Sequence, residues 1–351
     1  MDHKYAKLFA GAAAVALAAT SFGSAVVAQD DGYTMGVSNT LQGNGWREEM
    51  ICSIRAQALA SGEVSELIVA HRNTDAAGQL EDIRNLIAAD VDAIIVNPVS
   101  PDAVNDALAE AIDAGIVVVA VDMGVTQDGA YLMANDQEEY GYMGAKWLFE
   151  QVGGAGDIVY MRGIAGAQAD TDRDNGFKRA LAEYPDINIV SETFTGWDQA
   201  TGAQQINDVI NSGQNIDGVW TSGIDSVIVS ALTTAGIEGV PVVGADNSEF
   251  VNQLGTQAGL VGAAVTNPGS VGGAGVTLAL QILDGAAPED PAVLVSPELW
   301  DNQTPEGQEK IQAAIAASGS LDPFWPVTIS IPGWTTYTED QILACKGPGE
   351  E

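Results

Sequence analysis

Apolar runs alternate with amphipathic stretches along most of the chain. Runs such as AIIV (93–96) and VVVAV (117–121) are apolar at successive positions and not at every second one. That pattern is typical of strands covered on both faces, as in a parallel sheet. Because stretches with helical patterning separate the runs, the sequence predicts a doubly wound α/β fold.

The predicted elements follow one another in a regular order. Helices are expected at about 45–60, 76–89, 101–113 and 306–317. After about residue 286 a turn-rich segment surrounds one strand, and FWPVTISIPGW and a short helix carrying Cys345 close the chain. Strands are expected within YTMGVS, ELIVAH, AIIVNP, IVVVAVD, DIVYMRG, INIVSETF, DGVWTS, VPVVGAD and LVGAAVT.

Two segments resemble each other. AEAIDAGIVVVAVD (109–122) and TTAGIEGVPVVGAD (233–246) each combine the end of a helix, Ala-Gly-Ile and a buried strand that ends in aspartate. Asp122 and Asp246 would thus stand at the carboxyl ends of parallel strands, where open α/β sheets bind ligands. We expect two similar domains with a ligand cleft between them.

The first 28 residues have the pattern of a signal peptide. Lys4 and Lys7 precede an apolar stretch, and small residues lead to Ala28. The stretch is shorter than the roughly 20 apolar residues that span a bilayer, and no later run is long enough. We expect cleavage before Gln29, export to a periplasm and no membrane insertion.

The net charge is −35, from 48 acidic and 13 basic residues. So acidic a surface repels nucleic acid and anionic lipid. A solvated acidic surface and an acidic face that docks a basic partner are both compatible with this charge.

The two cysteines, Cys52 and Cys345, would be exported to an oxidising compartment. Cys52 lies off the predicted inward stripe of the first helix, which is formed by Trp46, Met50, Ile54 and Ala58. A disulfide and two separate free thiols are therefore both open.

Signals for catalysis, metal binding and cofactor binding are weak. His71 is the one histidine after the leader, and no G-x-S-x-G motif is present. DTDRDNG (170–176) has Asn175 and Leu181 where a calcium loop needs glycine and glutamate. NPGSVGGAG (267–275) lacks Gly-Lys-Ser/Thr, which favours close helix packing. We expect no enzyme, no metal and no cofactor.

A set of residues at strand ends offers amides, carboxylates, guanidinium groups and indole rings. Each polar member alone could cap a helix. Together they suit a neutral polyhydroxylated ligand, whose hydroxyls pair with polar groups while its C–H faces lie on aromatic rings. The set is Asn44, Trp46, Arg47, Asn97, Asp122, Asn135, Asp136, Arg173, Trp197, Asp225, Asp246 and Asn267.

Several motifs resemble periplasmic sugar-binding proteins of the ribose/galactose type, the type I solute-binding proteins of ABC transporters. They are VNPVSPDAV (96–104), VVVAVD, GIAGAQADTDRDNGF (163–177) and VPVVGADN (240–247). GNGWR is similar to the galactofuranose-binding branch. The resemblance implies an N-terminal lobe of 29–134, 267–293 and about 325–351, and a C-terminal lobe of 135–266 and about 294–324. Three hinge segments would lie near 134–136, 265–268 and about 293–300.

The resemblance also implies roles for the strand-end residues. Trp46 and Trp197 would sandwich a sugar ring. Asp122, Arg173 and Asp246 would bind its hydroxyls, Asn97 would support the loop, and Asp136, Asp225 and Asn267 match further polar positions. The chain departs from the family where Met123 replaces a common arginine and TSGID (221–225) replaces an Asn-Asp pair. Both changes bear on which sugar is bound.

The implied function is capture of a neutral monosaccharide, as pentose, hexose or furanose, by hinge closure and delivery to an ABC permease. We expect a monomer. The alternatives are a sugar receptor for a sensor kinase or chemoreceptor, and a binder of a polyol or furanose-like signalling molecule. A glycosidase using two cleft carboxylates, or a transcriptional regulator, fits less of the sequence.

Overall fold

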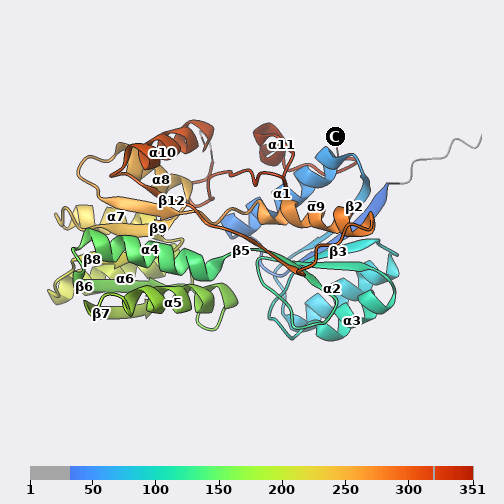
Figure 1. Cartoon of the computed structure of the whole chain (residues 1–351), viewed down its shortest axis with the longest axis horizontal. Helices are drawn as coiled ribbons and strands as arrows, with labels where there is room; N and C mark the ends of the chain where they lie inside the picture. Colours follow the sequence, from blue (N-terminus) through green and yellow to red (C-terminus); the bar gives the residue numbers. More distant parts are fainter. Residues whose placement is uncertain (1–31, 319–320, 351) are drawn as a thin grey trace, which may run out of the picture. The chain divides into compact units, whose positions relative to one another are not determined.

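The computed structural model describes residues 32–318 and 321–350, which contain two six-stranded sheets flanked by helices (Figure 1). The first sheet has the order β11-β5-β4-β3-β1-β2 and the second β12-β10-β9-β8-β6-β7. Neighbouring strands are parallel, except that β12 runs antiparallel to β10. The predicted α/β fold with two parallel-sheet domains is confirmed.

The strands of the first sheet are β1 (Tyr33–Asn39), β2 (Val64–His71), β3 (Ala93–Asn97), β4 (Val117–Val121), β5 (Tyr131–Asn135) and β11 (Ala292–Val295). The helices that accompany it are α1 (Gly45–Ser61), α2 (Ala76–Ala88), α3 (Asn105–Asp113), α9 (Val271–Leu283) and α11 (Glu339–Ala344).

The strands of the second sheet are β6 (Ala155–Arg162), β7 (Asp186–Phe194), β8 (Gly218–Trp220), β9 (Val242–Ala245), β10 (Gly262–Val265) and β12 (Leu299–Asp301). Its helices are α4 (Gln137–Gln151), α5 (Gln168–Leu181), α6 (Gln199–Ser212), α7 (Asp225–Thr234), α8 (Ser248–Thr256) and α10 (Pro305–Ser318).

Each sheet is buried on both faces. In β3, Ile95 packs into the core with α1 and α9, whereas its neighbours Ile94 and Val96 pack into the core with α2 and α3. In β6, Val159 and Tyr160 likewise enter different cores. This two-sided burial is the physical reason for the continuous apolar runs in the sequence.

The glycine-rich segment after β10 packs closely on α1. A methyl group added to Gly272 would lie 2.6 Å from the Met50 carbonyl oxygen, and one on Gly273 would lie 2.9 Å from the Ser53 carbonyl oxygen. The Ser53 hydroxyl donates to the Gly269 carbonyl and accepts from the Gly273 amide, each at 3.0 Å. The prediction that these glycines serve helix packing is confirmed.

Some predicted boundaries were wrong. The helix expected from residue 101 begins at Asn105, because residues 101–104 form a turn whose Ala103 amide donates to the Ser100 hydroxyl at 3.2 Å. Two strands, β11 and β12, occupy the region where one was expected, and β5 was not predicted. Only residues 296–298 separate β11 from β12, so the two strands have the pattern of one.

The chain passes between the two sheets after β5, after β10 and between β11 and β12. These passages lie at the three segments that the sequence analysis assigned to hinges. A fourth follows α10, because Val327 packs in the core of the second sheet and Ile331 in the core beneath α1. Bending at these segments and the limits of the lobes stay predictions.

The C-terminal tail is attached to α1. A disulfide joins Cys52 to Cys345, with 4.4 Å between the Cα atoms. Tyr337 and Ile342 are buried around it, and Arg55 donates to Glu350 at 2.6 Å. Of the alternatives for the cysteines, the structure contains the disulfide.

The predicted signal peptide, residues 1–28, lies outside the described residues. Among the helices that the structure does describe, none combines the length and the apolar composition that crossing a bilayer requires.

We predict that replacing both cysteines, Cys52→Ser with Cys345→Ser, lowers the free energy of unfolding by about 2–4 kcal/mol, because the link restricts the unfolded chain. Urea denaturation of both proteins measures the difference. Dithiothreitol should bring the wild type to the stability of the double variant and leave the variant unchanged. A wild type insensitive to the reductant would contradict the prediction.

Candidate ligand-binding site

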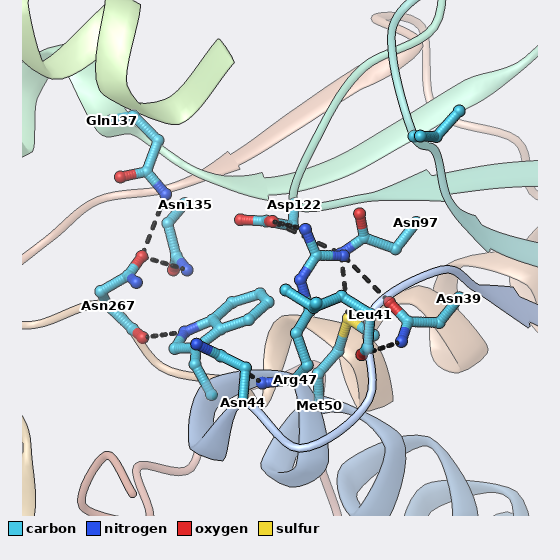
Figure 2. Close-up of polar contacts among 12 residues, drawn as sticks. Asn39, Leu41, Asn44, Arg47, Met50, Asn97, Asp122, Asn135, Gln137 and Asn267 are labelled. Atoms are coloured by element: carbon cyan, nitrogen blue, oxygen red, sulfur yellow. Dashed lines mark hydrogen bonds and ion pairs between the residues drawn. The ribbon is translucent and has the colours of Figure 1, made fainter. Parts of the chain in front are cut away.

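Polar side chains gather at the carboxyl edge of the first sheet (Figure 2). Asn39 and Asn97 are the last residues of β1 and β3 and are paired in register, and Asp122 directly follows β4. The first helix, α1, begins beside them. Asn44 is its N-cap, and the Asn44 side chain accepts from the Arg47 amide at 3.2 Å. Parallel register therefore brings together residues that lie far apart in the sequence.

Arg47 connects these groups. Its guanidinium donates to Asn39 Oδ1 at 2.9 Å and lies 3.8 Å from Asp122 Oδ2, and Asn97 Nδ2 donates to the same carboxylate at 3.4 Å (Figure 2). Burial lowers the pKa of Arg47 from its ordinary value, and Asp122 partly offsets this. A guanidinium remains charged through such a shift, so the edge carries a fixed positive charge beside a carboxylate.

The segment that follows β10 and contains Asn267 lies against this edge. Trp46 Nε1 donates to the Asn267 carbonyl oxygen at 2.6 Å (Figure 2). The side-chain amides of Asn135 and Gln137 both donate to Asn267 Oδ1 at 3.0 Å. Asn267 thus ties α1 to the segment between β5 and α4.

Arg173 and Trp197 come together at the second sheet. Arg173, on α5, donates from Nε to Gln137 Oε1 at 2.8 Å, and its guanidinium lies 5.9 Å from the centre of the Trp197 ring. Trp197 requires Gly163, since a methyl group at that position would lie 2.2 Å from the indole. The structure therefore places a guanidinium over an indole face, and a ligand role for both residues stays a prediction.

Two predicted site residues have an unusual backbone conformation. Asp122 has φ 66° and Trp197 has φ 53°, in the left-handed region that residues other than glycine rarely adopt. Such conformations cost free energy and cluster at functional sites. One strained residue from the predicted set therefore follows a strand of each sheet, Asp122 after β4 and Trp197 after β7.

Asp246 follows β9 and is buried. Its Oδ2 accepts from the Asn267 amide at 3.0 Å, while Oδ1 has no hydrogen-bond partner among the described residues. Burial raises the pKa of Asp246 to about 7, although the Asn267 amide and Arg173 act in the opposite direction. The carboxylate thus has a vacant acceptor that a ligand donor could use.

Three other predicted residues are engaged within the protein. Asn44 caps α1 as described, and Asp136 caps α4 by accepting from the Glu139 amide at 2.9 Å. Asp225 is fully buried under Gly244 and accepts from the Gly223 amide at 3.1 Å, and burial raises its pKa to about 7. Their partners are those of caps and turns.

A hollow of about 580 Å³ borders this region. Asp122, Asn135 and Asp136 line it together with Gln137, whereas Trp46, Trp197 and Asp246 do not. The hollow therefore lies beside the predicted residues, along β5 and α4. It does not surround them. Within residues 32–318 and 321–350, no group of three or more His, Cys, Asp or Glu side chains is placed to hold a metal ion.

Three further residues at this site were not predicted from the sequence. Asn39, the last residue of β1, accepts from Arg47, and Gln137, the first residue of α4, accepts from Arg173. Glu49 is buried on α1, and neither of its carboxylate oxygens has a partner in the described parts of the chain. Burial, helped by nearby Asp246, raises the pKa of Glu49 well above its ordinary value. The position of Asn39, a polar residue at the end of the first strand, was the sequence signal by which it could have been found.

Residues 35–287 match the family model described as the periplasmic binding protein domain. The chain belongs to this family. Its relatives are binding proteins for sugars and polyols, and the resemblance to ribose- and galactose-type proteins is confirmed.

Three comparisons illustrate how similar this periplasmic binding protein is to its relatives. A xylitol-binding protein of Mycolicibacterium smegmatis is 30% identical over 238 residues, which cover 67% of this chain and 68% of the relative. A galactofuranose-binding protein of Escherichia coli is 28% identical over 215 residues, covering 58% and 67%. A solved arabinose-transporter binding protein from Shewanella sp. ANA-3, bound to L-arabinofuranose, is 25% identical with a TM-score of 0.72, covering 82% and 99%.

We predict that Asp246→Asn stabilises this periplasmic binding protein at pH 8 when no ligand is present. A folded-state pKa near 7 lies above the ordinary value near 4, so the folded form binds the proton more strongly. The resulting stability is complete below about pH 4 and is lost as the pH rises to about 7. The side chain of the Asp246→Asn variant does not ionise. The variant therefore avoids that loss of free energy of unfolding, which is about 2–4 kcal/mol.

Urea denaturation at pH 8 and pH 4 tests this prediction, and the gain should disappear at pH 4. Asp208→Asn, at an exposed position on α6, is the control and should change neither value. A wild type more stable than Asp246→Asn at pH 8 would contradict it.

Proposed function

We propose that this chain captures a neutral monosaccharide or polyol by binding it with residues of both lobes. One observation carries the proposal. Asn97 Oδ1 and Asp246 Oδ1, at the carboxyl edges of the two sheets, are buried acceptors that find no partner among the described residues. An unpaired buried acceptor costs about 1–3 kcal/mol. Hydroxyl donors on a ligand would remove that cost at both positions.

The charges favour a neutral ligand. Asp122 and Asp246 would repel an anion, and Arg47 and Arg173 would repel a cation. A hydroxyl can donate to a carboxylate and accept from a guanidinium, so a polyhydroxylated molecule is compatible with both signs.

The indole rings of Trp46 and Trp197 complement this chemistry. We propose that their faces lie against the C–H surfaces of the ligand, while the polar edges bind its hydroxyls. The relatives bind xylitol, galactofuranose and L-arabinofuranose by name, which are all small polyhydroxylated molecules. The ligand class inferred from the site is therefore the class bound by the relatives.

We further propose that the protein is exported, works in the periplasm and delivers its ligand to an ABC permease without chemical change. The support is the family and the importer functions of its relatives. Deleting the gene should abolish high-affinity uptake of the radiolabelled ligand. Unchanged uptake, with loss of a transcriptional response to the same sugar, would indicate the sensing role instead.

We predict that a neutral sugar or polyol raises the melting temperature of the purified protein. A ligand at a hundred times its dissociation constant adds about 2.7 kcal/mol of stability. The panel for a thermal-shift screen contains xylitol, D-ribose, L-arabinose, D-galactose, myo-inositol, amino acids and organic acids. Protein unfolded in urea and refolded before the screen contains no sugar from the expression host.

Variants test whether the shift in melting temperature arises from binding at the proposed site. Trp46→Ala and Asp246→Asn should abolish the stabilisation, because they remove a stacking face and a charged acceptor, whereas Asp208→Asn should retain it. Stabilisation by amino acids or carboxylates alone would contradict the proposed ligand class. Proton NMR of the incubated sugar should show no new product, and turnover would favour an enzyme.

A further inference from the structure

His71 stands directly beside the Arg47 network. It ends β2 and is the register partner of Asn39, which ends β1. The His71 side chain is only 10% exposed. Its Nδ1 lies 2.8 Å from Asn39 Nδ2, and its Nε2 lies 3.1 Å from both carboxylate oxygens of Glu48. One imidazole therefore connects a carboxylate of α1 with the amide that binds Arg47.

The neighbours of Asn39 determine the tautomer of this imidazole. Asn39 Oδ1 accepts from Arg47 Nη1 at 2.9 Å, and Nδ2 donates to the Leu41 carbonyl oxygen at 2.7 Å, so the orientation of the amide is fixed. The second hydrogen on Nδ2 faces His71 Nδ1, which must present a lone pair. The ring proton of the neutral form consequently lies on Nε2, which donates to Glu48.

Protonation of His71 is incompatible with this arrangement. A charged imidazole donates from both nitrogens, so Nδ1–H would face Nδ2–H of Asn39. If the amide turned over to present its oxygen to His71, Nδ2 would face the guanidinium of Arg47, which is also a donor. The Asn39 amide can serve neutral His71 and Arg47 together, but not two cations.

We propose that His71 is a positioning residue for the ligand site: its neutral form holds Arg47 in place through Asn39, and its protonated form releases Arg47. Ligand affinity then falls as the pH decreases through the range in which histidines titrate. The proposed effect on affinity rests on the proposed function, because it assumes that Arg47 contacts the ligand.

Charged groups from the adjoining elements surround His71. Glu48, on α1, faces His71 Nε2, and its Oε1 also accepts from the Gly43 amide at 2.6 Å. Arg47, on α1, lies on the other side of the Asn39 amide. Arg72, next to His71, is paired with Asp82 of α2 at 2.8 Å.

The test uses the full chain labelled with ¹⁵N. Its two histidines are His3 and His71, and the signals that disappear in His71→Asn belong to His71. At pH 8 we expect the Nε2–H tautomer. As the pH falls to 5, the Nε–H signal of Arg47, assigned by its loss in Arg47→Lys, should shift with the midpoint of the imidazole. An Nδ1–H tautomer at pH 8 would overturn the proposal.

His71→Asn is also the matched variant, because its side-chain oxygen can still accept from Asn39 but does not titrate. Any shift of Arg47 caused by Asp225 or Asp246 persists in it, whereas the shift caused by His71 disappears. An Arg47 titration that is the same in both proteins would overturn the proposal, and so would an Arg47 signal that does not move in the wild type.

Calorimetry with xylitol, D-ribose and L-arabinose provides a second readout. From pH 8 to pH 5, wild-type affinity should fall about tenfold more than that of His71→Asn, the effect of losing one charge-assisted hydrogen bond. Equal pH dependence would overturn the proposed effect on binding. If none of these probes binds, the proposed function fails for them, while the NMR titration still decides whether His71 positions Arg47.

Discussion

Burial of both faces of each parallel sheet is the constraint on which this structure depends. Strands enclosed by helices tolerate apolar side chains along their length, as Ile94 and Ile95 illustrate in β3. In the inner strands β3 and β4, polar residues are therefore confined to the carboxyl ends, where the chain leaves the core. Because parallel strands end at the same edge, Asn39, Asn97 and Asp122 meet there although their sequence positions are far apart. The folding constraint itself places these polar groups together at the edge where we propose that the ligand binds.

The same burial makes the proposed site energetically unfavourable when no ligand is bound. Desolvation raises the pKa values of Asp225 and Asp246 to about 7 and leaves acceptors on Glu49 and Asp246 without partners in the described residues. Asp122 and Trp197 add backbone strain. A site that is destabilised when empty gains more from a ligand that supplies the missing donors, which is a common exchange of stability for function.

Local pattern explains what could be predicted from the sequence. The alternation of strands and helices, the aspartates directly after β4 and β9, and the close helix packing of the glycines in 267–275 all follow from periodicity or side-chain size. The hydrogen-bonding role of each polar residue does not follow from local pattern. Asp136 and Asp246 both follow strands, yet one caps a helix and the other keeps a vacant oxygen. The difference depends on tertiary neighbours. The same holds for Asn39, whose partners come from β2 and α1.

The central claim is that one polyhydroxylated molecule satisfies acceptors on both sheets. A high-resolution crystal structure of the protein grown with the sugar or polyol that stabilises it most is the direct test. We predict one ligand with hydroxyl oxygens at hydrogen-bond distance, about 2.5–3.0 Å, from Asn97 Oδ1 and from Asp246 Oδ1. A ligand that contacts neither atom, or water molecules bound at both atoms while the ligand lies elsewhere, would contradict the account.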